Sequence, residues 1–292
     1  MAEFLELSFE LGALDAEAAS EAGFGCGACA VTFVDARDDP LFEPAPGEVR
    51  LWPATRVKCL FTAAADRETL TRSLAAALGL EAALIGAQLL ADRAWEHEWL
   101  KDSHAMRFGR RLWVAPHHER VAEPGALTVH LDPGLAFGTG THASTALCLS
   151  WLDQHLPPGG CVIDYGCGSG VLALAAARLG AAAVHAFDID YQALIATRDN
   201  AHANGLGGQL QIHSDPQTLP RAADVLLANI LAPALCELAP RFAALLRPGG
   251  QVVLAGLLPH ESADVTAAYG ACFDVTRYGE RDGWVCLTGR RH

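Results

Sequence analysis

The clearest hydrophobic pattern along the chain lies between Cys161 and Asp190. A short apolar run ends at Asp164, a glycine-rich turn follows, and a second apolar run ends at Asp188. A helix-forming segment at residues 171–179 separates the two runs. Short apolar runs bounded by glycine are typical of buried strands, so the pattern predicts strand, tight turn, helix and strand.

Strands and helices continue to alternate after this stretch. The pattern predicts helices at residues 143–155, 191–204 and 232–246, and strands at residues 209–213, 223–231 and 251–258. Such alternation implies an α/β fold with a parallel, doubly wound sheet. The end of the chain differs, because the runs 272–278 and 284–288 flank Asp282-Gly283, which is a hairpin signal. A doubly wound sheet that ends in an antiparallel hairpin is expected of a class I methyltransferase that depends on S-adenosylmethionine.

The N-terminal part has a different order of elements. We expect strands at residues 4–10, 28–34, 56–62 and 83–91, and helices at residues 13–22 and 66–78, the second capped by Asp66. The order β-α-β-β-α-β predicts a small ferredoxin-like α+β domain at residues 1–92. Residues 93–126 are rich in aromatic residues and histidines and predict a structured connector, which leaves residues 127–292 for the catalytic domain.

The chain of 292 residues is acidic, with 34 acidic and 21 basic residues and a net charge of −13. This balance disfavours direct DNA binding and anionic membranes and would favour a basic partner, although an ordinary acidic surface explains the charge more simply. The N-terminus alternates and is acidic, so it predicts no signal peptide, and no apolar run reaches the length of a membrane span. Nine scattered cysteines are typical of reduced thiols in a cytoplasmic protein.

The sequence predicts no metal site. Cys26 and Cys29 form a lone C-x-x-C that no second pair or nearby histidine completes, so we interpret them as packing or turn residues. The histidines of the connector fit no ligand spacing.

The glycine-rich turn indicates a bound nucleoside. Glycines let the backbone approach a ligand closely, and Asp188, which lies 20 residues after Gly168, can accept hydrogen bonds from both ribose hydroxyls. A dinucleotide site needs the spacing G-x-G-x-x-G, whereas Gly166, Gly168 and the next glycine are spaced G-x-G-x-G. Asp164 before the turn would repel a pyrophosphate and suit a cationic ligand such as S-adenosylmethionine.

A second candidate site is the loop at residues 131–145. It combines glycines and hydroxyl side chains directly before a predicted helix, as a loop that wraps a polar ligand does. An elaborate helix-capping turn is the alternative interpretation.

Four motifs resemble one family closely: D-P-G-L-A-F-G-T-G-T-H at 132–142, D-Y-G-C-G-S-G at 164–170, D-I-D at 188–190 and A-N-I-L at 228–231. Together with residues 95–109 they are similar to the bacterial methyltransferases of large-subunit ribosomal protein L11. The resemblance is strong over residues 95–292 and rests on architecture over residues 1–92. It implies that the N-terminal domain grips the basic ribosomal protein. It also implies that the catalytic domain methylates α-amino and lysine ε-amino groups, converting S-adenosylmethionine to S-adenosylhomocysteine.

The resemblance implies which residues carry this chemistry. The positions expected to contact the cofactor are Thr145, Gly166, Asp188 and Asn229, beside Gly168 and Asp164 of the turn region. The side-chain carbonyl of Asn229 can accept an amine N–H and aim the lone pair, and the backbone carbonyl of Ile230 can accept another.

Three further assignments stay open. Phe137 and Thr141 could line the methyl channel, and His142 could shuttle protons or cap the loop. Asn229 could instead be the N-cap of a helix at residues 231–245.

Other functions remain alternatives at this point. They are a methyltransferase of another protein amine or a small molecule, an NAD-dependent oxidoreductase, and a non-catalytic module that binds the cofactor. The glycine spacing and terminal hairpin disfavour the oxidoreductase, and the A-N-I-L segment disfavours a non-catalytic module. We expect a monomer.

Overall fold

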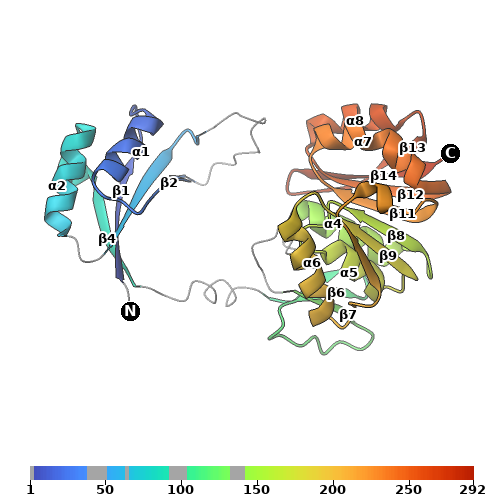
Figure 1. The fold of residues 1–292 in the computed structure, drawn as a ribbon. Helices are drawn as coiled ribbons and strands as arrows, with labels where there is room; N and C mark the ends of the chain where they lie inside the picture. The colour runs from blue at the N-terminus through green and yellow to red at the C-terminus, as the bar shows by residue number, and fades with distance from the viewer. Residues whose placement is uncertain (1–2, 38–50, 63–65, 92–103, 132–141) are drawn as a thin grey trace. The chain divides into compact units, whose positions relative to one another are not determined.

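The structure is a computed structural model, and it describes residues 3–37, 51–62, 66–91, 104–131 and 142–292. The chain divides into two compact units, Met1–Glu98 and Trp99–His292, which Figure 1 colours from blue to red along the chain. Each unit is described by itself.

The first unit contains a four-stranded antiparallel sheet in the order β2-β3-β1-β4. Its elements are β1 (Glu3–Glu10), α1 (Ala16–Gly25), β2 (Ala30–Asp35), β3 (Thr55–Thr62), α2 (Arg67–Leu78), the short 3₁₀ helix η1 (Ala82–Leu84) and β4 (Gly86–Ala91). Alternate residues of β1, namely Leu5, Leu7 and Phe9, are buried in its core. Asp66 caps α2 as expected, because its carboxylate accepts a hydrogen bond from the backbone N–H of Thr69 at 3.1 Å. The order of elements is the expected one, and the ferredoxin-like assignment stays a prediction.

The second unit is built on a seven-stranded sheet in the order β10-β9-β8-β11-β12-β14-β13. Its elements are α4 (Ala143–His155), β8 (Cys161–Tyr165), α5 (Val171–Arg178), β9 (Ala183–Phe187), α6 (Tyr191–Ala203), β10 (Leu210–His213), β11 (Ala223–Asn229), α7 (Ala232–Leu245), β12 (Leu246–Leu257), α8 (Ser262–Tyr269), β13 (Phe273–Arg281) and β14 (Trp284–Arg291), with the 3₁₀ helices η2 (Pro216–Thr218) and η3 (Pro259–Glu261). Strands β8 to β12 pair in parallel, and β13 and β14 pair antiparallel. This confirms the predicted doubly wound sheet and its terminal hairpin.

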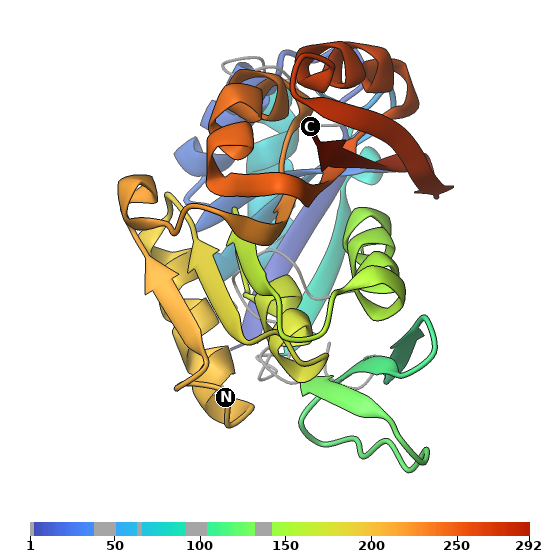
Figure 2. The same cartoon turned by 90° about the vertical axis from the view of Figure 1, so that its right-hand side faces the viewer.

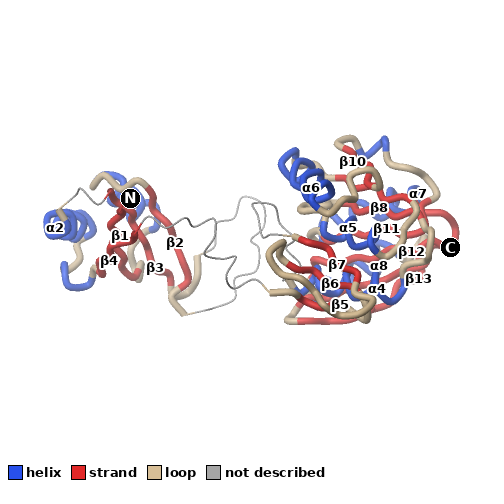
Figure 3. The backbone as a smooth tube through the Cα atoms, turned by 90° about the horizontal axis from the view of Figure 1, so that it is seen from below, coloured by secondary structure: helices blue, strands red, loops and turns tan. Residues whose placement is uncertain are grey.

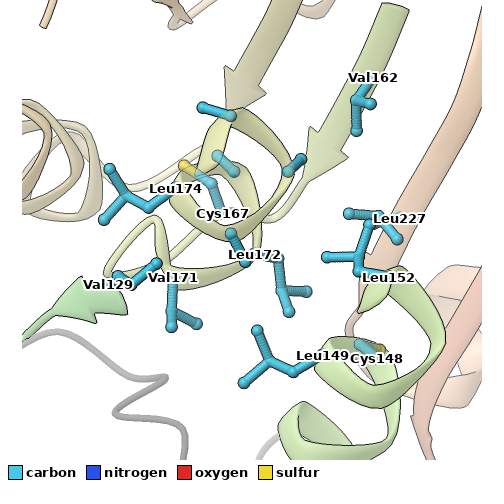
Figure 4. Close-up of a cluster of buried hydrophobic side chains, with 14 of the residues drawn as sticks. Val129, Cys148, Leu149, Leu152, Val162, Cys167, Val171, Leu172, Leu174 and Leu227 are labelled. Atoms are coloured by element: carbon cyan, nitrogen blue, oxygen red, sulfur yellow. The ribbon is translucent and has the colours of Figure 1, made fainter. Parts of the chain in front are cut away.

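Helices cover both faces of this sheet (Figure 2). Along β11, Val225 and Leu227 pack in one core with residues of α4, α5 and α6, whereas Leu226 and Ala228 pack in the other with α7 and α8. Figure 4 shows the first core, in which side chains of α4 and α5 meet between the helices and the sheet. A strand buried on both faces is apolar throughout, which explains the continuous apolar run of β11 in the sequence.

A short three-stranded sheet lies before α4 in the chain (Figure 3). Its strands are β5 (Met106–Phe108), β6 (Leu112–Ala115) and β7 (Leu127–His130). Phe108, Leu112 and Val129 are buried in the same core as α4 and α5. The described residues of the predicted connector are therefore packed into the second unit.

Several elements differ from the expectation. The 3₁₀ helix η1 lies where the strand expected at residues 83–91 would begin. Strand β12 begins at Leu246, before the Pro248-Gly249-Gly250 segment that we expected to be a turn, and the residues between Leu246 and Gln251 include extra residues where its register with β11 shifts. Helix α8 was not expected, since its eight residues are too few to show a helical period and, unlike α5, they follow no glycine-rich turn.

The carboxylate of Asp153 in α4 ties the β5–β6 turn to the unit. It accepts hydrogen bonds from the backbone N–H groups of Arg110, Arg111 and Leu112, and its side chain is fully buried. Gly109 in this turn has φ = 73°, and a Cβ there would collide with Asp153. The Asp153 carboxylate thus connects the β5–β6 turn to helix α4 through hydrogen bonds.

We expect Asp153→Ala to lower the free energy of unfolding by about 2 kcal/mol, because backbone donors would lose their acceptor in a partly buried place. Urea denaturation measures this change. Asp199→Ala, at an exposed position of α6, is the matched control and should leave the urea midpoint unchanged. Equal midpoints for the two variants would contradict the anchoring role of Asp153.

Candidate functional site

The glycine-rich turn between β8 and α5 is shaped by backbone contacts to β9. Gly166 and Gly168 have φ values of 83° and 54°, a region that residues with a Cβ rarely adopt. The N–H groups of Gly166 and Cys167 donate to the carbonyl of Phe187 at 2.8 and 3.0 Å. The turn is therefore held at the carboxyl end of the sheet, where ligands of doubly wound folds bind.

Asp188, directly after β9, holds the glycine-rich turn through a hydrogen bond. One oxygen of its carboxylate accepts the N–H of Gly168 at 2.9 Å, and the other accepts the N–H of Asp190 at 2.9 Å. Each carboxylate oxygen has a second lone pair, so both can still accept a ribose hydroxyl. The structure thus brings together the turn and the acid that the sequence analysis paired.

Two residues of α6 also hold the turn, and the sequence analysis did not identify them as part of the site. The hydroxyl of Thr197 donates to the carbonyl of Gly168 at 3.0 Å, and the amide of Asn200 donates to the carbonyl of Ser169 at 2.8 Å. Their spacing of three residues places both on one side of the helix. This three-residue spacing is the only signal for them in the sequence. Polar residues three apart are common on exposed helices, so the spacing does not by itself indicate a site.

Asp164 carries a carboxylate inside the protein. The residue is fully buried; its Oδ2 accepts the N–H of Ala173 at 3.0 Å, and its Oδ1 has no hydrogen-bond partner among the described residues. Burial raises the pKa of Asp164 to about 7, the bond from Ala173 opposes this rise, and the charge of Asp188 adds to it. Ala173 lies in the first turn of α5, where the helix dipole favours an anion.

Asn229 ends β11, and its side chain reaches α4. The Nδ2 of Asn229 donates to the hydroxyl of Thr145 at 3.1 Å, and Thr145 is 1% exposed. With Nδ2 used in this way, the side-chain carbonyl of Asn229 is left to accept a donor from elsewhere. The alternative of Asn229 as a helix N-cap is wrong, because α7 begins at Ala232 and its N-cap is Leu231.

His142 begins α4 as its N-cap. Its Nδ1 accepts from the N–H of Ser144 at 3.4 Å and contacts the hydroxyl of Ser144 at 2.7 Å. Its ring packs edge-on against that of Trp284, with the ring centres 4.7 Å apart. The contacts of His142 with Ser144 therefore support the capping interpretation. Phe137 and Thr141 lie outside the described residues.

The residues of this edge form one connected site. Asp188 contacts Gly168, Thr145 contacts Asn229, and β11, which carries Asn229, pairs in parallel with β8, which carries Asp164. A Cβ on Gly166 would lie 2.5 Å from a methyl carbon of Ile230, so the turn and the segment after β11 touch. Sequence-predicted residues that are up to 84 positions apart are thus neighbours.

These residues fit S-adenosylmethionine, which carries a ribose, a sulfonium and an ammonium group. The unpartnered Oδ1 of Asp164 lies at this edge near the carboxylate of Asp188, and a cationic ligand there would favour the charged form of Asp164. The positive φ values of the turn leave its backbone open to close approach. Asp188 supplies acceptors for the ribose.

The described parts of the chain were searched for metal-binding clusters and for helices that could span a membrane. No cluster of three or more histidine, cysteine, aspartate or glutamate side chains there is arranged to hold a metal ion. Of the helices that the structure describes, none is both long and apolar enough to span a membrane.

Comparisons with known proteins identify what this chain is similar to. The family model described as ribosomal protein L11 methyltransferase (PrmA) matches residues 3–292. Ribosomal protein L11 methyltransferases from Pseudomonas aeruginosa (strain LESB58) and Pseudomonas putida (strain GB-1) are 47% identical over 277 residues and 45% identical over 289 residues. These alignments cover 94% of both chains for the first relative and 99% of both for the second. The crystal structure of a ribosomal protein L11 methylase from Lactobacillus delbrueckii subsp. bulgaricus has a TM-score of 0.60 and 30% identity, and covers 65% of this chain and 100% of its own.

The buried carboxylate of Asp164 predicts a pH-dependent stability. A carboxyl group with a folded pKa of about 7 and an ordinary pKa of 3.8 binds its proton more tightly in the folded state. The folded protein therefore holds more protons than the unfolded chain between about pH 4 and pH 7, and stability falls as pH rises through this window. The fall is at most about 1.4 kcal/mol per pH unit.

Asp164→Asn removes this titration, so its stability should decrease less than that of the wild type between pH 5 and pH 8. Urea midpoints of both proteins at the two pH values measure the difference. Other groups titrate equally in the two proteins and cancel in the comparison. Parallel pH profiles would show that Asp164 is not a buried acid with a raised pKa.

Proposed function

Because this chain belongs to the ribosomal protein L11 methyltransferase family, we propose that it transfers methyl groups from S-adenosylmethionine to amino groups of ribosomal protein L11. The enzyme class and the cofactor are those of the family. The substrate protein and the role of each residue are proposed. The observation that carries the mechanism is the hydrogen bond from Asn229 to Thr145, because it orients an acceptor at the edge of the cofactor site.

The cofactor would lie over the glycine-rich turn. Gly166 and Gly168 would allow its close approach, Asp188 would accept the ribose hydroxyls, and the charge of Asp164 would stabilise the cationic end. When bound, S-adenosylmethionine would supply a methyl group on a sulfonium: the amine lone pair bonds to the methyl carbon, the carbon–sulfur bond breaks in line, and S-adenosylhomocysteine leaves. The proposed set of cofactor contacts also includes Thr145, Asn229, Phe137 and Thr141, with Phe137 and Thr141 as residues lining the methyl channel.

The protein would contribute alignment to the reaction. The side-chain carbonyl of Asn229 accepts one N–H of the incoming amine, and the backbone carbonyl of Ile230 accepts another. Two acceptors fix the direction of the lone pair, and holding two reactants in line is worth several orders of magnitude in rate. Because Nδ2 of Asn229 donates to Thr145, the amide cannot turn its donor towards the amine without losing a bond.

The amine must be neutral to react. An α-amino group with a pKa of about 7.7–8.0 is partly neutral at pH 7, whereas a lysine with a pKa near 10.4 must lose its proton to burial or to solvent. The α-amino group therefore needs no strong base. For a lysine, a channel that excludes water suffices, because burial lowers the pKa of its amine. Methylation of both kinds of amine is compatible with this arrangement.

The first unit would hold the substrate protein. Ribosomal proteins are basic, and the net charge of −13 on this chain would speed the encounter. We propose that the enzyme acts as a monomer in the cytoplasm, where its nine cysteines, all free in the structure, stay reduced. The NAD-dependent alternative is not favoured, since family and fold are those of methyltransferases.

The substrate is tested with labelled S-adenosylmethionine and purified, unmodified ribosomal protein L11. Intact-mass measurement should show L11 gaining mass in steps of one methyl group. Absence of any gain, with the cofactor still bound in calorimetry, would contradict L11 as the substrate while leaving the cofactor site in place.

Asn229→Ala should lower the rate of methyl transfer by about 10²-fold, because the amine loses an acceptor that aims it. The rate is compared at saturating S-adenosylmethionine, and the affinity for S-adenosylhomocysteine is measured separately, so that a lost cofactor contact is distinguished from a misaligned amine. The urea midpoint should fall modestly, because the buried Thr145 loses its hydrogen bond from Asn229. A wild-type rate for Asn229→Ala would rule out its orienting role.

A further inference from the structure

Gly256 lies where strand β12 becomes irregular at the carboxyl edge of the sheet. It has φ = 84°, and the register of β12 with β14 shifts between Leu254 and Leu257. The residue before it, Ala255, accepts the N–H of Ile230 at 3.2 Å. The end of β12 is thus joined to the segment that follows β11.

Gly256 lies directly against the peptide group of Ile230. A Cβ on Gly256 would be 2.5 Å from the carbonyl oxygen of Ile230, 3.0 Å from its carbonyl carbon and 3.1 Å from its nitrogen. These are backbone atoms, so no side-chain rotation can relieve the contact. Glycine at position 256 therefore allows this place for the Ile230 peptide, and a residue with a Cβ would displace it.

The side chain of Ile230 contacts the glycine-rich turn. A Cβ on Gly166 would lie 2.5 Å from the γ2 methyl carbon of Ile230. Ile230 therefore contacts two glycines with positive φ, Gly166 in the turn and Gly256 on β12. The two contacts differ in kind, since the first is made with a side chain and the second with the backbone.

We propose that Gly256 is a positioning residue for methyl transfer. It sets the place of the Ile230 peptide, and through it the place of the neighbouring Asn229, relative to the glycine-rich turn. The positions of the two proposed amine acceptors relative to the cofactor site are then fixed. This inference rests on the proposed transfer to an amine.

The proposal is tested with Gly256→Ala against Gly180→Ala. Gly180 lies between α5 and β9, away from the carboxyl ends of the strands; its φ is 98°, and a Cβ there would meet nothing within 4 Å. Both variants carry the strain of an alanine at positive φ, so the comparison isolates the contact with Ile230. The readouts are kcat and KM for ribosomal protein L11, the affinity for S-adenosylhomocysteine by calorimetry, and the urea midpoint.

For Gly256→Ala we expect kcat to fall about 10²-fold relative to Gly180→Ala, with KM and the affinity for S-adenosylhomocysteine unchanged. A displaced Ile230 carbonyl misaligns the amine and leaves Asp188, the proposed ribose acceptor, in place, whereas a merely structural glycine would change the urea midpoint in both variants and kcat in neither. An equal kcat in the two variants would overturn the positioning role. An inactive wild type would overturn the proposed function instead, and the inference with it.

A second pair of variants tests independently of position 256 whether the rate depends on the place of Ile230. Gly166→Ala should be slow because its Cβ meets the γ2 methyl group of Ile230. Adding Ile230→Ala removes this methyl group and should restore part of the rate, whereas adding Ile230→Val keeps it and should not. Equal rates for the two double variants would show that the rate does not depend on the place of Ile230, which would overturn the positioning role of Gly256 as well.

Discussion

The hydrogen bond from the N–H of Gly168 to the carboxylate of Asp188 is the contact on which the rest of the site depends. It joins two strand ends that are 20 residues apart, at a length of 2.9 Å. With Thr197 and Asn200 holding the turn from α6, it fixes a loop that has no regular secondary structure of its own. A turn held in this way presents open backbone to a ligand without having to be ordered by it, which lowers the cost of binding.

The same edge contains a group that opposes folding. Asp164 is a fully buried carboxylate with one oxygen unpartnered among the described residues, and burial raises its pKa to about 7. Buried acids without full compensation reduce stability and are retained at functional sites. A cationic ligand would supply the missing charge, so the site would be more stable when occupied than when free.

Much of the fold could be predicted from the sequence because local signals agreed with tertiary structure. The apolar runs and glycines around residues 161–190 predicted β8, α5 and β9, and the bounds of α4 agree with the expected helix. Helix α8 and the early start of β12 could not be predicted, since the first is too short to show a period and the second depends on pairing with β11.

The residues of the candidate site were predicted better than their contacts. Asp164, Asp188 and Asn229 follow apolar runs, and strand ends of a parallel sheet meet at one edge. The bond between Asn229 and Thr145 joins residues 84 positions apart and has no local signal. Gly256 is likewise one of 28 glycines in the chain, and only its distance to the peptide of Ile230 distinguishes it.

In the proposed mechanism the cofactor and the amine acceptors lie at the same edge of the sheet. A crystal structure with S-adenosylhomocysteine bound would show whether they do. We expect the ribose hydroxyls within hydrogen-bond distance of the Asp188 carboxylate, and the sulfur facing the side-chain carbonyl of Asn229. A nucleoside bound elsewhere, or a sulfur turned away from Asn229, would contradict the proposed mechanism.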